Sequence, residues 1–193
     1  MERFQLTEIS ADELKALLTS YSIAIDEWGY CESKTVAHLL AELHKSESTL
    51  QETEDGKLLR VVRGVGINVF YQDKGRLLRL QETRQVFSDG RGRRRDLSTS
   101  VGEKMKPDES PNEAATRTLT EELGISPFGL SPDYSVEDRE VILSTSFPGL
   151  WTKNTVYVFD CFISPEEYRP EGYIEVQTDK TNYYEWREVL ANA

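Results

Sequence analysis

The side chains most able to do chemistry lie between Gly102 and Ile125, where a glycine turn leads into a helix that carries acids. Thr118, Glu121 and Glu122 are spaced i, i+3 and i+4, which predicts a hydroxyl and two carboxylates on one helix face. Adjacent acids repel each other, and near the end of a helix they also oppose its dipole. A bound cation relieves both costs, and oxygen ligands suit Mg²⁺ or Mn²⁺. A solvated helix face is the alternative, because paired acids are common on exposed helices.

Local signals define where this helix begins and ends. Ser110 can act as N-cap, Pro111 suits the first helical position, and Glu113 completes a capping box. Gly124 supplies a left-handed stop. A small apolar stripe recurs every four residues and is expected to face a sheet: Ala115, Leu119 and Leu123.

The whole segment resembles the Nudix box, in which a glycine, a glutamate and a helix with an Arg-Glu and a Glu-Glu pair recur at fixed spacing. Glu109 is followed after seven residues by Arg117. The later positions of the box are filled in order by Leu119, Glu121, Glu122, Gly124 and Ile125. So long a spaced match is specific, and the segment is identified as a degenerate Nudix box.

Two positions depart from the family pattern. Glu103 stands six residues before Glu109, where the family has glycine, so Gly102 alone remains of the usual glycine pair. Thr118 replaces the glutamate that follows the arginine, and a threonine hydroxyl is a weak neutral ligand that cannot act as a base near pH 7. Glu103 is a candidate to supply a carboxylate from the loop side.

The resemblance implies an α/β (α+β) fold, a Nudix-type α/β/α sandwich around a mixed β-sheet, and metal-assisted attack of water on a diphosphate. Carried over residue by residue, it makes Glu121 and Glu122 metal ligands and catalytic groups, and Arg117 the catalytic residue that orients them. Gly102 and Glu109 complete the expected metal site. Mg²⁺ or Mn²⁺ is the implied cofactor, and a phosphorylated small molecule is the implied ligand.

Other candidate residues lie outside the box. A further carboxylate often joins this metal site in the family, and by position the candidates are Glu171, Glu175 and Glu185. The one basic cluster directly precedes the glycine turn and, as a strand, would align three arginines on one face: Arg91, Arg93 and Arg95. Contact with a substrate diphosphate and a solvated hairpin are the two interpretations of this cluster.

Composition bounds the remaining functions. A hydrophobic content of 38% in 193 residues is ordinary for a globular protein, so general disorder is not indicated. A net charge of −11 argues against broad nucleic-acid binding and against anchoring to anionic membranes. Cys31 and Cys161 show no metal or disulfide spacing, and no segment has the length of a signal or a membrane span. We expect a soluble, acidic protein of a reducing compartment, cytoplasmic or inside an organelle.

The predicted secondary structure changes from helix to strand near residue 56. Residues 1–55 are expected to form a helical, acidic N-terminal extension, with a second capping box at Ser10 and an apolar run from Val36 to Leu43. The serine- and acid-rich segment 46–56 is the expected boundary. Residues 56–193 are expected to form the Nudix-like domain. Its strands are predicted at 57–71, 76–87, 139–145, 155–163 and 182–187.

Two functions from different classes follow. The first is a Mg²⁺-dependent hydrolase of nucleoside diphosphate-linked compounds with reduced or altered activity, which the retained Arg117, Glu121 and Glu122 favour. The second is a catalytically inactive Nudix-fold module that binds a phosphorylated ligand or a protein partner, which Thr118 and Glu103 favour. A second copy of the chain is a further candidate partner.

Overall fold

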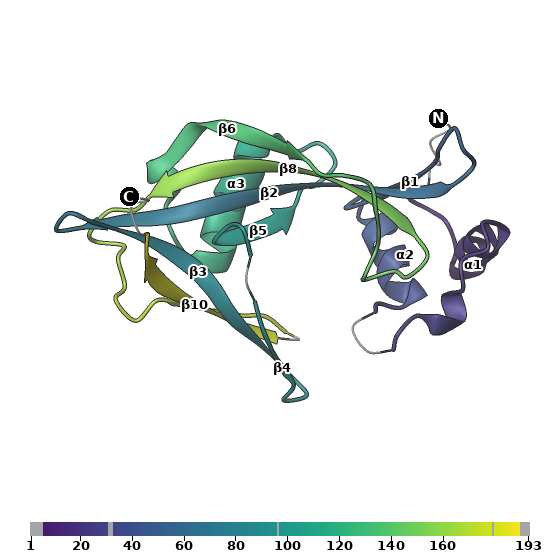
Figure 1. Ribbon diagram of the computed structural model, residues 1–193, viewed down its shortest axis with the longest axis horizontal. Coiled ribbons are helices and arrows are strands. Elements are labelled where there is room, and N and C mark those ends of the chain that lie inside the picture. Colours follow the sequence, from purple (N-terminus) through teal and green to yellow (C-terminus); the bar gives the residue numbers. More distant parts are fainter. Residues whose placement is uncertain (1–5, 31–32, 96, 179, 190–193) are drawn as a thin grey trace. The chain divides into compact units, whose positions relative to one another are not determined.

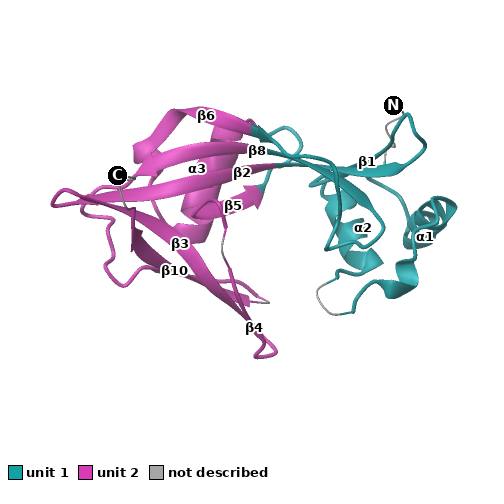
Figure 2. Cartoon of the chain, viewed as in Figure 1, with its two compact units in different colours: residues 1–63, 104–109, 137–156 teal, residues 64–103, 110–136, 157–193 magenta. Residues whose placement is uncertain are grey.

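The computed structural model describes residues 6–30, 33–95, 97–178 and 180–189 (Figure 1). Two compact units make up the chain (Figure 2). Unit 1 contains residues 1–63, 104–109 and 137–156, and unit 2 contains residues 64–103, 110–136 and 157–193. Cys31 lies outside the described residues. Each unit is described by itself below, and the expected domain boundary near residue 56 stays a prediction.

The first half of the chain contains α1 (Ala11–Ser20), η1 (Ile25–Glu27), α2 (Val36–His44), β1 (Thr49–Glu52), β2 (Leu58–Asp73), β3 (Arg76–Phe87), β4 (Gly92–Arg94) and β5 (Val101–Lys104). The second half contains α3 (Pro111–Thr118), η2 (Leu119–Leu123), η3 (Pro127–Gly129), β6 (Leu130–Asp138), β7 (Ile142–Leu143), β8 (Trp151–Phe162), β9 (Tyr173–Val176) and β10 (Lys180–Glu188). Strands neighbour each other in the order β6-β8-β2-β3-β10-β9. The α+β class with a mixed sheet and N-terminal helices is confirmed.

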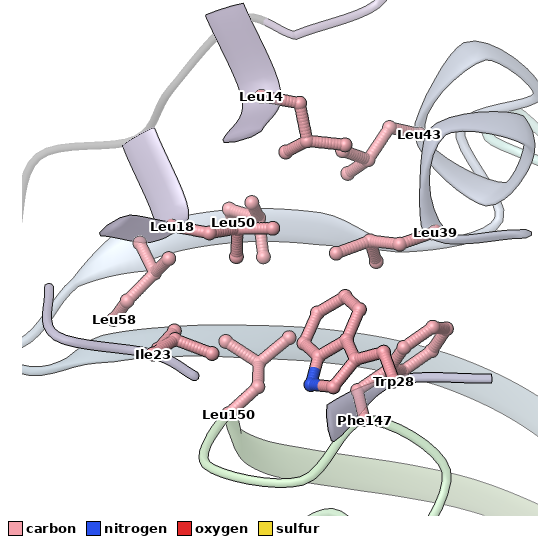
Figure 3. Packing of buried hydrophobic residues seen from close by; sticks show 10 residues of the cluster. All are labelled: Leu14, Leu18, Ile23, Trp28, Leu39, Leu43, Leu50, Leu58, Phe147 and Leu150. Atoms are coloured by element: carbon pink, nitrogen blue, oxygen red, sulfur yellow. The ribbon is translucent and has the colours of Figure 1, made fainter. Parts of the chain in front are cut away.

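Unit 1 has its own hydrophobic core. The predicted capping box of α1 is present, since the Ser10 hydroxyl accepts from the backbone of Glu13 and the Glu13 carboxylate accepts from Ser10 in return. The packed side chains come from α1, the segment between α1 and α2, α2, β1, the start of β2 and the loop before β8. Figure 3 shows them: Leu14, Leu18, Ile23, Trp28, Leu39, Leu43, Leu50, Leu58, Phe147 and Leu150. Trp28 lies against Phe147, with 5.1 Å between the ring centroids, and its indole N–H donates to the carbonyl of Pro148. Burying such side chains drives this unit to fold.

A buried carboxylate, Glu42 of α2, organises the polar part of unit 1. Its side chain is 5% exposed and accepts from Arg60 Nε at 3.1 Å. Lys34 and Lys104 add ion pairs at 2.9 and 2.7 Å. Burial raises the pKa of Glu42, but the attraction of Arg60 and of the two lysines outweighs it and lowers that pKa to about 2. Glu42 therefore stays ionised near neutral pH.

Unit 2 is a sheet whose inner face is partly polar. β2 and β3, which match two predicted strands, form a hairpin through a turn at Lys74 and Gly75, and β10 pairs antiparallel with β3. On the buried face, Tyr184 lies opposite Glu82 and Asn182 lies opposite Gln85. Since alternate residues of a strand point to opposite faces, a row of buried polar groups crosses the inner face here.

The helix of the box forms as predicted, but Gly102 lies in the strand β5 and not in a turn. Ser110 caps it together with Glu113, and Gly124 ends it in the left-handed conformation at φ 63°. Leu119 and Leu123 are buried, at 0% and 4% exposure, which confirms the apolar stripe. The last turn, η2, widens to π-helical geometry, a feature often found at functional sites.

Gly102 of β5 and Gly66 of β2 leave room for neighbouring backbone and side-chain atoms to approach closely. A Cβ on Gly102 would lie 3.0 Å from the carbonyl oxygen of Val65, and one on Gly66 would lie 2.8 Å from the Thr99 side chain. Side chains at these positions would push β5 away from β2, where the two strands pair.

Several strand predictions need correction. The expected boundary segment 46–56 contains β1, which pairs with β2. The strand predicted at 139–145 is only the two-residue β7, while the longer β6 lies earlier, at Leu130–Asp138. β6 is mostly exposed, so its apolar residues do not show the alternation of a half-buried strand.

Candidate functional site

Three carboxyl groups meet at the end of the box helix in unit 2, and we call them the inner carboxylate cluster: Glu103 of β5, Glu122 of η2 and Glu175 of β9. The side chain of Glu122 interacts with that of Glu103, and this interaction raises the pKa of Glu122. The Tyr184 hydroxyl lies between Glu122 and Glu175, within 3.5 Å of Glu122 Oε2 and 3.4 Å of Glu175 Oε2, and can donate to either carboxylate. Elements distant in sequence thus supply one acidic site.

The strand β10 fixes the third member of the cluster. Glu175 lies opposite Asn182 in the β9–β10 pairing, and Asn182 Nδ2 donates to Glu175 Oε2 at 2.5 Å. The Gln177 side-chain amide donates to the other carboxylate oxygen. Two amides therefore hold Glu175 as an oriented acceptor facing Tyr184.

The cluster is electrostatically strained. Burial raises the pKa of Glu122 to about 9, and the negative charges of Glu175 and Glu103 add to this shift. Burial also raises the pKa of the Tyr184 hydroxyl, with further contributions from Glu122, Glu175 and Glu82. Strongly shifted pKa values with charged causes gather at functional sites more often than elsewhere, so this cluster is the candidate active site.

Two buried oxygens beside the cluster have no hydrogen-bond donor in the described structure. They are Glu82 Oε1 and Asn182 Oδ1, and both residues are 3% exposed. The other oxygen of Glu82 accepts from Arg95 Nε at 3.4 Å. A buried acceptor without a donor costs free energy, which a cation or a donor group of a ligand would recover.

The donor set fits a hard divalent cation in its chemistry, because every candidate ligand is an oxygen. Among the residues that the structure describes, no three acidic, histidine or cysteine side chains already form a group that could hold a metal ion. Instead, Glu122 interacts with Glu103. Glu122 and Glu175 each lie within hydrogen-bond distance of the Tyr184 hydroxyl. Oxygen ligands are thus present, without a closed three-ligand arrangement.

The structure separates the three side chains expected on one helix face. Thr118 is fully buried, and its hydroxyl donates to the carbonyl of Ala114 at 2.8 Å. The Glu121 side chain is 60% exposed and pairs with Arg117 Nη1 at 3.4 Å. Glu122, one turn after Thr118, turns toward the sheet, where the Tyr184 hydroxyl donates to its carboxylate.

The other residues predicted for the metal site lie in different places. Gly102 belongs to β5, directly before Glu103. Glu109 belongs to unit 1, where its carboxylate accepts from the backbone N–H of Lys106 at 2.9 Å. Of the loop acids, Glu175 joins the cluster, whereas Glu185 pairs with Arg187 at 2.7 Å.

Of the arginine cluster only Arg93 lies in the short strand β4, with Arg91 and Arg95 just beyond its ends, and the three divide between two environments. Arg91 pairs with Asp89 at 2.7 Å in an exposed hairpin. Arg93 Nε donates to Gln85 Oε1 at 2.8 Å, and Arg95 donates to Glu82. Arg93 and Arg95 therefore reach the polar row of the inner face, while Arg91 does not.

Sequence reasoning missed the polar row itself, formed by Glu82, Gln85, Asn182 and Tyr184. One signal was present, since Asn182 and Tyr184 alternate in a strand that was predicted correctly. Their partners on β3 depend on a register shift between Tyr183 and Tyr184, which the sequence does not reveal.

The family assignment follows from the comparison with protein families, in which the model for the NUDIX domain matches residues 60–189. The chain belongs to the NUDIX family. The Nudix-type fold expected from the box is thereby confirmed. Nudix hydrolases generally use a divalent metal such as Mg²⁺. A comparison with curated proteins found no match.

Solved structures with a similar fold include an Ap4A hydrolase from C. elegans, with 14% identity and a TM-score of 0.40 over 66% of this chain and 80% of that one. A MutT/nudix family protein from Enterococcus faecalis has 17% identity and a TM-score of 0.44, covering 82% of this chain and 52% of that one. The NUDIX domain of Shewanella oneidensis NrtR, solved with ADP ribose, has 16% identity and a TM-score of 0.35 over 65% and 71%.

Among the described residues, no helix is both long and apolar enough to cross a membrane.

Proposed function

We propose that this NUDIX protein is a Mg²⁺- or Mn²⁺-dependent hydrolase that cleaves the diphosphate of a nucleoside diphosphate linked to another group. The observation that carries the proposal is the position of Glu103. This residue replaces a family glycine, and its side chain interacts with Glu122, so β5 offers a carboxylate beside a helix that carries Thr118 in place of a family glutamate. The metal site would then use the carboxylate of Glu103 in place of the family glutamate that is absent at Thr118.

Each residue of the site has a proposed role. Glu122, Glu103 and Glu175 would hold the metal ion, which when bound polarises a phosphate oxygen and lowers the pKa of water. Arg117 braces the helix end through Glu121, and this agrees with an orienting role for Arg117 rather than a ligand role for Glu121. Arg93 and Arg95, on the edge of the polar row, would contact the substrate diphosphate.

A substrate panel tests the proposal directly. Nucleoside diphosphate sugars, dinucleoside polyphosphates and ADP-ribose are incubated with the full chain and Mg²⁺ or Mn²⁺, and nucleoside monophosphate release is measured. We expect turnover of at least one compound that stops with EDTA and returns with added metal. Absence of turnover across the panel with both metals would contradict the hydrolase proposal.

Replacing Glu103 tests this proposed ligand. We expect Glu103→Gln to weaken Mg²⁺ binding about tenfold in calorimetry, because a neutral amide is a poorer ligand for a hard cation. Glu121→Gln is the matched control, since it makes the same isosteric change at the neighbouring exposed carboxylate and should leave affinity within about twofold. An equal loss in both variants would show that only the overall charge matters.

Thr118→Glu in the Glu103→Gln background extends this test. Residue 118 lies one turn before Glu122, so a glutamate there returns a carboxylate to the same side of the helix. We expect Mg²⁺ affinity and hydrolysis to recover at least partly. If the double variant still bound Mg²⁺ weakly, neither residue 103 nor residue 118 would supply the metal ligand.

A catalytically inactive module that binds a phosphorylated ligand or a protein partner is the second candidate. The observations in its favour are the buried Thr118 hydroxyl and the lack, among the described residues, of a closed three-ligand group. Such a module would bind a phosphorylated ligand in calorimetry without releasing product, with or without Thr118→Glu. Turnover by the native chain would exclude it.

A further inference from the structure

The outer face of unit 2, opposite the inner carboxylate cluster, carries a groove rich in arginine. Its volume is about 460 Å³. We call it the arginine groove, and it is lined by Gln81, Thr83, Arg84, Arg94, Arg95, Glu185 and Arg187. Gln81 and Glu185 face each other across β3 and β10, one residue along from the buried pair Glu82 and Tyr184, so they point to the opposite face.

Like charges are placed directly opposite each other on this face. Arg84 is the cross-strand partner of Arg94, and Arg187 is the cross-strand partner of Arg79. Such pairs of like charge are unfavourable in a sheet. In a chain of net charge −11, four arginines line one groove against a single acid, Glu185. An anion in the groove would turn this repulsion into attraction.

The arginines are also arranged to receive an anion. The Arg84 guanidinium lies over the ring of Tyr183, 4.1 Å from its centroid, which holds its plane while its edge donors can serve a ligand. Arg187 is paired with Glu185 at 2.7 Å, with side chains 60% and 55% exposed, so this surface pair is weak enough to rearrange. Planar guanidinium groups bind phosphate through two parallel hydrogen bonds.

We propose that the arginine groove is a second binding site, which shares only Arg95 with the proposed catalytic site, for a small phosphorylated anion such as a diphosphate or a nucleoside diphosphate. The volume falls in the range of small-molecule sites. The strong negative charge of the whole chain disfavours a nucleic-acid polymer. Because the groove lies on the other face of the sheet, occupation does not require the inner carboxylate cluster.

Calorimetry with inorganic pyrophosphate and with ADP, in EDTA so that no metal-dependent site is filled, tests this proposal. We expect the native chain to bind one of these anions and Arg84→Gln with Arg94→Gln to weaken binding about tenfold or more. The matched control is Arg76→Gln with Arg139→Gln, which removes two arginines from exposed ion pairs outside the groove. The control should change affinity by less than about twofold.

Further variants separate this site from the proposed active site. Glu122→Gln should retain anion binding in EDTA, whether or not the protein proves to be a hydrolase. Arg84→Lys with Arg94→Lys keeps the charge but loses the forked donors, and we expect intermediate affinity from a variant whose melting curve matches the native one. Binding of neither anion, equal losses in the control, or tighter binding of an oligonucleotide or an acidic peptide would overturn the proposal.

Discussion

Glu42→Gln should destabilise unit 1 by about 3–5 kcal/mol, because it removes the carboxylate that balances a buried guanidinium and also pairs with two ammonium groups. Arg60 is 7% exposed and donates to Glu42 through Nε, while Lys34 and Lys104 lie within 3 Å of the same carboxylate. Glutamine keeps the shape but loses the charge, so Arg60 stays buried without compensation.

The same residue makes the stability of unit 1 depend on pH in the acid range. The folded pKa of Glu42 is about 2, below its ordinary value of 4.5. A lowered folded pKa means that the stabilisation is fully present above pH 4.5 and is lost as pH falls from 4.5 toward 2. The Glu42→Gln variant should lack this loss, so the two free energies of unfolding should converge in acid.

Urea unfolding at several pH values measures both effects. In a Trp186→Phe background the remaining tryptophans, Trp28 and Trp151, both lie in unit 1 and report its unfolding by fluorescence. Asp12→Asn is the control, since Asp12 is 94% exposed in its pair with Lys15 and should contribute little. A free energy of unfolding that is the same for Glu42→Gln and the native chain at pH 7 would refute the assigned role of Glu42.

Elements governed by local signals could be predicted from the sequence. The box helix follows from Ser110, Pro111 and Gly124, and α1 follows from its capping box, because caps and stops act within a few residues. The β2–β3 hairpin likewise follows from its glycine turn. The family assignment rests on the same stretch, since the box is a local pattern.

The site could be predicted only in part, because its geometry depends on contacts between distant segments. Glu122 and the candidate Glu175 were named from the sequence, but their approach to Glu103 depends on how β5, β9 and η2 pack. The expectation that Glu121 shares the site assumed regular α-helical spacing through residue 122. In the structure Glu121 lies on the surface, where it pairs with Arg117 four residues earlier.

The polar row on the inner face depends on register. A shift between Tyr183 and Tyr184 sets which residues of β3 face Tyr184 and Asn182, and a slip of one residue would send all of them to the other face. Two arginines of the outer groove, Arg84 and Arg187, lie on the same two strands. Composition reveals the acids and arginines, whereas the pairing of β3 with β10 decides that they lie on opposite faces.

Glu122→Gln should lower metal-dependent turnover by at least about 100-fold, equivalent to about 2.7 kcal/mol of transition-state stabilisation. Glu122 is the member of the cluster that contacts both Glu103 and Tyr184, so its loss removes the central proposed ligand. Glutamine has nearly the same shape, and its amide can still bond to Tyr184. The loss should therefore come from the missing charge.

The same substitution should stabilise the metal-free protein. The folded pKa of Glu122 is about 9, above its ordinary value of 4.5, so the native chain loses stability as pH rises from 4.5 toward 9. Glutamine cannot ionise, and we expect the variant in EDTA to exceed the native chain by about 1–3 kcal/mol near pH 8, with a smaller difference near pH 5. Thermal melts at these two pH values, with and without Mg²⁺, measure this gain, and Glu121→Gln provides the exposed control. If Glu122→Gln lost turnover and was also less stable than the native chain at both pH values, Glu122 would support the fold. Its assignment as a metal ligand that destabilises the metal-free protein would then be wrong.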